Sequence, residues 1–204
     1  MSFQLERSSG AKCYMISARE LSIVWGDTPH YWKWIPVAYT SRVDRFSEVA
    51  HLLNVCWLEI HGKIQTRILS PKTNYAAYLI YKLDAASHGL QVPAQETSVK
   101  LGTHESKHKV RLQPADSEQS IGGHGLFYRF FQGIVGVPRQ EICEDLEENR
   151  IPGVRNDGWM EMEMGEFFND GGDDGEVDMC LLEVKGRHWK SGLTVLGIEV
   201  RPKK

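Results

Sequence analysis

Residues 57–69, WLEIHGKIQTRIL, constrain the fold of this chain more than any other stretch, because apolar and polar side chains alternate along them. Leu58, Ile60 and Ile64 share one face of this pattern, and the opposite face is polar. Such a period of two is typical of an antiparallel strand with one face in a core and the other toward solvent. Gly62 falls on the apolar face, where it indicates a bulge or the close approach of another backbone.

The remaining strand patterns predict that this sheet is not alone. Residues 74–83 are apolar on both faces, which places them at the centre of the packing. Residues 46–53 have apolar side chains at i, i+3, i+6 and i+7 and predict two turns of helix. Shorter strand patterns, separated by Gly- and Pro-containing turns, cover residues 12–16, 21–25, 97–101, 109–112, 126–131, 158–164, 176–184 and 193–202. Many short antiparallel strands with little helix predict an all-β sandwich.

Length and charge narrow the classes of function. A chain of 204 residues favours one domain over residues 1–204, because two halves would each have a small core. Residues 141–176 contain thirteen acidic residues against Arg150 and Arg155, which leaves the rest mildly basic. No dense cluster of Lys and Arg surrounds Trp25, so nucleic acid is not the expected partner.

The four cysteines and the apolar segments bear on cofactors and compartment. The cysteines lack metal-finger or CxxC spacing, so we expect free thiols and neither a metal nor another cofactor. No apolar run approaches eighteen residues, and the N-terminus lacks the apolar region of a signal peptide, which predicts a soluble intracellular protein without a membrane partner. The polar opening also suggests that an upstream domain precedes this segment in the natural chain.

Residues 21–35, LSIVWGDTPHYWKWI, hold three of the six tryptophans. The strand pattern ends at Trp25, a turn containing Asp27 follows, and Trp32 lies just beyond it. Flat aromatic faces beside polar groups suit a ligand with apolar ring faces and polar edges, such as a sugar or a stacked base. We expect Trp34 to belong to the core, and Trp25 and Trp32 to be exposed at a binding site.

Three segments carry a family resemblance: WGDTPHYWKW, VCWLEIHGKIQTRILSPKTNYAAYLIYK, and the C-terminal stretch from DGWMEMEM to EVRPKK. In this order and spacing they resemble the phloem protein 2 family of plant lectins, the Nictaba-like proteins. The resemblance runs from about residue 12 to the end, interrupted by a variable insertion at about residues 98–155. The opening SFQLERSSGAKCYMISARELSIVWGDTP is most similar to members that carry an F-box ahead of the lectin-like domain.

The resemblance implies a jelly-roll-like antiparallel β-sandwich, with short helices in its loops, that binds N-acetylglucosamine oligomers and N-glycan cores. It also implies a location in cytoplasm and nucleus, no metal, and often a homodimer. The two tryptophans implicated in sugar binding by Nictaba match Trp25 and Trp32, and its two implicated glutamates match Glu176 and Glu183. Asp27 and Lys190 are further candidates because they lie in loops that flank the tryptophan strand or the last hairpin.

Three functions compete at this point. The first is a carbohydrate-binding domain in which tryptophans stack on sugar rings and ionised carboxylates accept hydrogen bonds. The second is a glycoside hydrolase, which we do not expect because no acidic residue lies in an apolar context that would raise its pKa. The third is a protein- or glycoprotein-recognition domain that selects substrates for an SCF-type ubiquitin ligase, with the aromatic stretch 121–138 as its contact surface.

Overall fold

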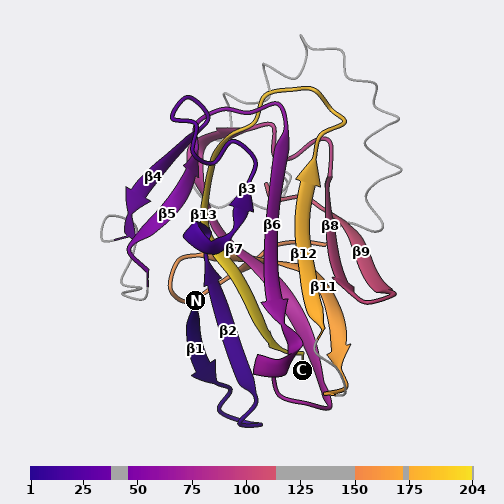
Figure 1. Ribbon diagram of the computed structural model, residues 1–204. Helices are drawn as coiled ribbons and strands as arrows, with labels where there is room; N and C mark the ends of the chain where they lie inside the picture. The colour runs from indigo at the N-terminus through magenta and orange to yellow at the C-terminus, as the bar shows by residue number, and fades with distance from the viewer. Residues whose placement is uncertain (38–45, 114–149, 172–174, 204) are drawn as a thin grey trace.

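The computed structural model describes residues 1–37, 46–113, 150–171 and 175–203, and these form an all-β sandwich of two antiparallel sheets (Figure 1). The predicted all-β fold class is therefore confirmed. The expected strand at 126–131 and the aromatic stretch 121–138 lie outside the described residues. Within the described ranges, no helix is long and apolar enough to cross a bilayer.

The first sheet contains eight strands. Its main path runs β1 (Ser2–Leu5), β2 (Lys12–Ser17), β13 (Ser191–Pro202), β7 (Thr73–His88), β11 (Met160–Asn169) and β10 (Gly153–Val154). The hairpin of β4 (Trp32–Pro36) and β5 (Glu48–Leu52) joins through pairing of β5 with β13. Two short 3-10 helices, η1 (Ala18–Glu20) and η3 (Thr66–Ile68), follow β2 and precede β7.

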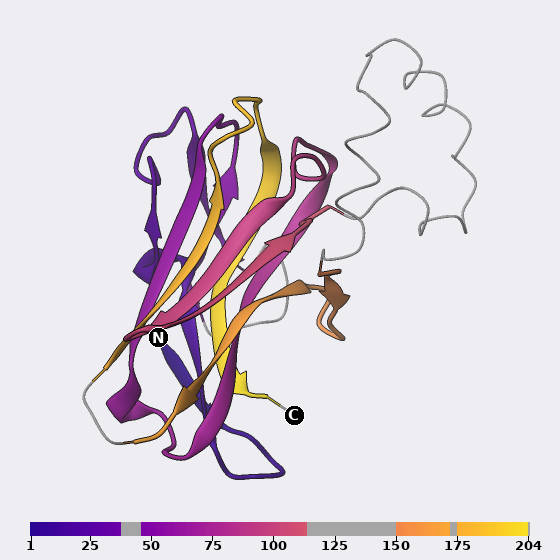
Figure 2. The same cartoon turned by 90° about the vertical axis from the view of Figure 1, so that its right-hand side faces the viewer.

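The second sheet has five strands, in the order β3 (Ser22–Ile23), β6 (Leu58–Gln65), β12 (Glu176–Glu183), β8 (Gln95–Leu101) and β9 (His104–Val110). Figure 2 shows the two sheets edge-on, with β8 and β9 in front of the layer formed by β7 and β13. Every pairing within it is antiparallel, so residues directly opposite one another form rows across the sheet.

The main core lies between the two sheets and follows the predicted alternation. Leu58, Ile60 and Ile64 of β6 are buried there, and Tyr75 and Tyr81 of β7 are fully buried opposite them. The outward face of β7 supports a second apolar cluster, composed of Met15, Val37, Val49, Ile80, Trp159 and Leu196. This second cluster explains why residues 74–83 are apolar on both faces.

Two local predictions were wrong. Residues 46–53 were expected to form a helix, but Glu48–Leu52 forms strand β5, because pairing with β4 and β13 outweighs a short pattern that also fits a helix. At Gly62 there is no bulge in the pairing with β12 and no approaching backbone. A Cβ there would instead lie 2.9 Å from Ile198 Cδ1 of the facing sheet and 3.0 Å from Leu21 Cδ2, so side chains fill the space.

The outward side of the first sheet carries a network of ion pairs. Arg201 donates to Glu161 at 2.7 and 2.9 Å and to Glu199 at 2.8 Å, and Arg155 joins the same two carboxylates. The Arg201 guanidinium also lies 3.7 Å from the centroid of the Tyr78 ring. Charge-assisted hydrogen bonds arranged in a network tie β7, β11 and β13 together on the side away from the main core.

Candidate functional site: an aromatic loop end

Loops 24–31, 53–57 and 184–190 meet at one end of the sandwich, at the top of Figure 1. Backbone hydrogen bonds connect them: Val55 and Lys190 exchange bonds of 3.0 and 2.7 Å, and Leu53 N–H donates to the carbonyl of Tyr31 at 2.9 Å. We call this surface the aromatic loop end. Its exposed tryptophans are Trp25 (42% exposed), Trp57 (43%) and Trp189 (50%).

Trp25 occupies the tip of the first loop in a backbone conformation that tryptophan rarely adopts. Its φ is 58°, and it is the third residue of a turn closed by the Gly26 N–H donating to the Ile23 carbonyl at 2.9 Å. A positive φ at this turn position normally belongs to glycine. The Trp25 ring lies 5.2 Å from the Tyr31 ring, tilted by 38°, so two aromatic rings share this tip. Backbone strain at an exposed aromatic residue is a frequent feature of functional sites.

Trp32 does not share that exposure. It begins β4, is only 2% exposed, and belongs to the main core, so the expectation of a surface position is corrected. Its indole N–H is buried and has no hydrogen-bond acceptor among the described residues. Trp34, which was expected in the core, is instead half-buried: its indole N–H donates to the Gly26 carbonyl at 3.0 Å, and Arg19 lies 3.7 Å from its ring centroid.

Glu183 and Lys190 are neighbours, as a buried ion pair at the base of the loop end. Lys190 is fully buried and Glu183 is 4% exposed. The Lys190 ammonium also donates to the carbonyls of Cys56 and His188, each at 3.0 Å, and Glu183 Oε1 accepts from the Gly186 N–H at 2.8 Å. The pair therefore holds loops 53–57 and 184–190 together.

Glu176 is not near the other candidates. It lies at the opposite end of β12 from Glu183, about 23 Å away for seven residues of extended chain. An odd separation also puts the two side chains on opposite faces of the sheet. Glu176 faces solvent, where it accepts from Lys63 at 2.7 Å and from Gln65 at 2.8 Å. Asp27 is exposed in the same loop as Trp25. The structure thus gathers Trp25, Asp27, Glu183 and Lys190 at one end and leaves Glu176 at the other.

Sequence reasoning did not single out the residues around Trp57. Its indole N–H donates to Glu59 Oε2 at 2.6 Å, and the His61 ring lies 2.7 Å from Glu59 Oε1. The hydrogen bonds from His61 and Trp57 lower the pKa of Glu59 from its ordinary value. The alternation in residues 57–65 contained this signal, because it places Trp57, Glu59 and His61 on the same polar face of β6.

The described ranges contain no group of three or more His, Cys, Asp or Glu side chains arranged to hold a metal ion. Cys13, Cys56 and Cys180 are free thiols. Fold and site together define an antiparallel β-sandwich domain with an aromatic, loop-built surface at one end. The model of the Phloem protein 2 family matches residues 11–202, and the chain belongs to this family.

Similar proteins from Arabidopsis thaliana carry F-box names. F-box protein PP2-B15 is 44% identical over 205 residues, covering 98% of this chain and 68% of the relative. F-box protein PP2-B10 is 40% identical over 202 residues, covering 98% and 64%, and F-box protein VBF is 40% identical over 201 residues, covering 98% and 70%. The chain therefore spans about two thirds of the length of these relatives. Among solved structures, the Podospora anserina GH26-CBM35 beta-(1,4)-mannanase aligns with 94% of this chain and with 28% of the mannanase chain, at 9% sequence identity and a TM-score of 0.41.

Proposed function

We propose that this domain is a lectin that binds N-acetylglucosamine oligomers or N-glycan cores at the aromatic loop end. The exposed Trp25 ring beside the half-buried Tyr31 ring is the observation that carries the proposal, because aromatic faces beside polar groups match the apolar faces and polar edges of sugar rings. Asp27, in the same loop, is the exposed carboxylate of this site. Glu183 and Lys190 act as positioning residues, because their buried pair joins two of the three loops.

The proposed activity is binding without catalysis. A glycosidase needs two carboxyl groups that face one bond, about 5–10 Å apart. Glu176 and Glu183 lie at opposite ends and on opposite faces of β12, and Glu183 is neutralised by Lys190. Product analysis after long incubation with chitotriose checks this: shortening of the oligomer that depends on the protein contradicts a purely binding role.

A titration with N-acetylglucosamine oligomers by calorimetry tests the lectin proposal. We expect measurable binding of the dimer and trimer, and a loss of about tenfold or more in affinity for Trp25→Ala with an unchanged fold. Lys33→Ala is a control, since Lys33 is an exposed residue of β4 beyond the loop. Binding of no oligomer by the unmodified protein contradicts the proposal.

A second candidate function is the selection of protein or glycoprotein substrates for an SCF-type ubiquitin ligase. The F-box names of relatives that are about 40% identical over nearly all of this chain favour it. In this proposal an F-box upstream in the natural chain would contact ligase components, the domain would act in cytoplasm and nucleus, and a homodimer is an additional assembly to test. Partners captured from plant extract and not released by free chitotriose would favour this second function over sugar binding.

A further inference from the structure

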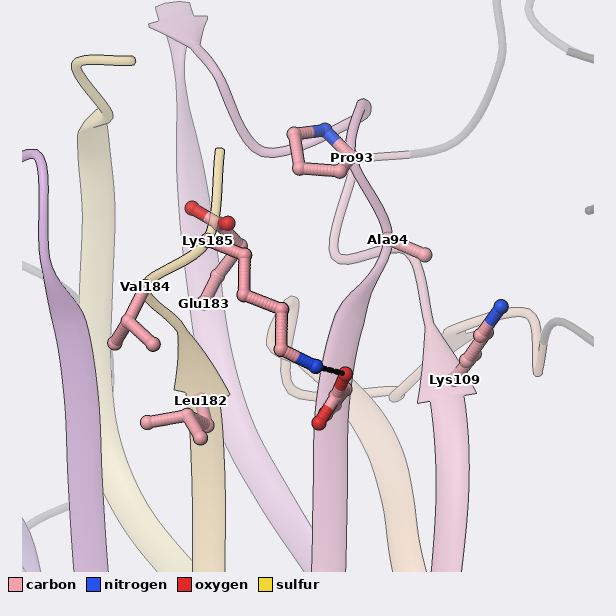
Figure 3. A pocket seen from close by; sticks show the side chains of 8 residues that line it. Pro93, Ala94, Lys109, Leu182, Glu183, Val184 and Lys185 are labelled. Carbon is pink, nitrogen blue, oxygen red and sulfur yellow. Dashed lines mark hydrogen bonds and ion pairs between the residues drawn. The ribbon is translucent and has the colours of Figure 1, made fainter. Parts of the chain in front are cut away.

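The outer face of the second sheet carries a trough that leads away from the aromatic loop end. Two adjoining hollows of 280 and 630 Å³ lie over β12, β8 and β9, and both are lined by Glu96, Lys109 and Leu182. Figure 3 shows the hollow nearer the loops, with Leu182 below Val184 and with Lys109 on β9, two strands away. The larger hollow continues along the sheet past Cys180 and Ser98.

The strand register explains the shape of this trough. One row across the sheet consists of Glu59, Leu182, Glu96 and Lys109, and the next consists of His61, Cys180, Ser98 and Lys107. Successive rows are two residues apart, about 6.6 Å along each strand. In the second row the two middle side chains, Cys180 and Ser98, are short, and the outer ones, His61 and Lys107, are longer and polar. In the first row Leu182 lies beside Glu96, which is long and polar. The floor is therefore low at Cys180 and Ser98, and polar groups surround it.

The charges along the rims are satisfied within the protein. Lys185 donates to Glu96 at 2.7 Å, as the dashed line in Figure 3 marks, and Lys107 lies 3.1 Å from Glu105. Glu59 accepts from Trp57 and contacts His61. A surface whose charges pair with one another offers many hydrogen-bonding groups and little net attraction for an anion or a cation. It is complementary to a neutral polar ligand.

Trp57 lines neither hollow, but it lies at the loop end of the same sheet face. It precedes β6 on the same outward face as Glu59 and His61, and its ring is 43% exposed. Trp25 follows β3, the strand that pairs with β6, so Trp25 and Trp57 lie at the same end of the sheet. The trough thus runs along the sheet toward the aromatic loop end, where we propose that sugar binds. A folded protein partner would be expected to anchor large apolar side chains, but among the described residues the larger hollow offers one, Leu182.

We propose that Trp57 and this trough bind the extension of a neutral oligosaccharide whose first rings occupy the aromatic loop end. Trp57 would stack on a ring at the junction, Leu182 would contact an apolar sugar face, and Glu59, Ser98 and Lys109 would hydrogen-bond hydroxyl or acetamide groups. This inference rests on the proposed function, because it assumes that the loop end binds the first rings. It adds that affinity depends on oligomer length.

Calorimetry with N-acetylglucosamine dimer, trimer and hexamer tests the inference on four variants. Ser98→Tyr fills the trough with a residue that strands accommodate well, and Lys100→Tyr is its matched control, outward on the same strand but lining neither hollow. Trp57→Ala removes the junction ring, and Trp25→Ala removes the loop-end ring. Far-UV circular dichroism and the melting temperature establish that each variant is folded.

We expect the unmodified protein to bind the hexamer at least tenfold more tightly than the dimer. Ser98→Tyr and Trp57→Ala should lose that advantage while their affinity for the dimer stays within about twofold, whereas Trp25→Ala should weaken both oligomers. Lys100→Tyr should behave like the unmodified protein. Equal affinity for dimer and hexamer, or a Ser98→Tyr protein that binds the hexamer normally, overturns the trough and leaves the lectin proposal standing. Failure of every oligomer to bind overturns the lectin proposal itself.

Cys180 provides an independent measurement without a substitution in the trough. It lines the larger hollow and is a free thiol, so its alkylation at alkaline pH can be followed by peptide mass spectrometry. Saturating hexamer should slow this alkylation at least fivefold, and saturating dimer should leave it unchanged. Alkylation that the bound hexamer does not slow contradicts the inference. A glycoprotein that protects Cys180 and is not displaced by free hexamer would indicate a protein-binding face instead.

Discussion

The buried pair between Glu183 and Lys190 allows a decisive test of what the carboxylate at position 183 does. Lys190 is fully buried, and Glu183 contributes the opposite charge, so Glu183→Gln leaves a buried ammonium whose acceptors, including the Cys56 and His188 carbonyls, are all neutral. Removing one partner of a buried ion pair costs about 3–5 kcal/mol. A domain of this size loses roughly 2–4 °C of melting temperature per kcal/mol, so we expect a decrease of about 6–20 °C.

A double-mutant cycle separates the pair from its surroundings. Lys190→Met should destabilise by a similar amount, because it leaves the Glu183 carboxylate buried with the Gly186 N–H. The double variant should be about as stable as either single variant, so the coupling in the free energy of unfolding should be about as large as one single loss, about 3–5 kcal/mol, measured by urea denaturation. Glu176→Gln, on the same strand but exposed, is the matched control and should change stability little.

The competing interpretation gives the opposite pattern. If Glu183 accepts hydrogen bonds from a sugar, Glu183→Gln should weaken chitotriose binding at an almost unchanged melting temperature. A single variant that unfolds at the same urea concentration as the unmodified protein would refute the structural role that we derive from burial. Loss of stability without loss of affinity in the folded fraction would support that role and remove Glu183 from the ligand contacts.

Three further results are expected. Trp32→Ala should cost about 3–5 kcal/mol of folding stability, because it removes buried apolar surface and leaves a cavity. Trp25→Ala should stay within about 1 kcal/mol of the unmodified protein and should lose sugar affinity. Calorimetric melting with a parallel titration checks both variants, and a Trp32→Ala protein as stable as the unmodified one would contradict the core position of Trp32. Hydrogen bonding by Arg201 lowers the pKa of Glu161, so the stabilising contribution of Glu161 is present above its ordinary pKa of 4.5 and is lost as the pH falls below that value. Urea midpoints measured from pH 7 to 3 should therefore decrease less steeply for Glu161→Gln than for the unmodified protein. Identical pH profiles would contradict the ion network. Burial raises the pKa of Cys180 to about 11, so at neutral pH this thiol should react with an alkylating reagent much more slowly than free cysteine does. Timed labelling followed by mass spectrometry measures the rate, and rapid labelling would contradict the partly buried position of Cys180.

Local patterns were sufficient for most strands but not for every segment. Alternation in residues 57–65, 176–183 and 193–202 identifies strands because neighbouring side chains of a strand point to opposite faces whatever the rest of the chain does. The same reasoning gave the wrong structure for residues 46–53, because a short apolar pattern suits both a helix and a strand. There the partner strands β4 and β13 decided the outcome, and they lie elsewhere in the sequence.

The candidate site divides in the same way. The sequence by itself determined the all-β class and the presence of a turn around Trp25. The separation of seven residues requires Glu176 and Glu183 to face opposite sides once both lie in one strand, although the sequence analysis assigned them to the same site. Only the tertiary structure decided that Trp32 is in the core, that Glu183 is neutralised by Lys190, and that two hollows lie over β12, β8 and β9 of the second sheet. Exposure and charge pairing depend on segments far apart in the chain, so no local pattern contains them. Period-two alternation, in contrast, is a property of the strand's own backbone geometry.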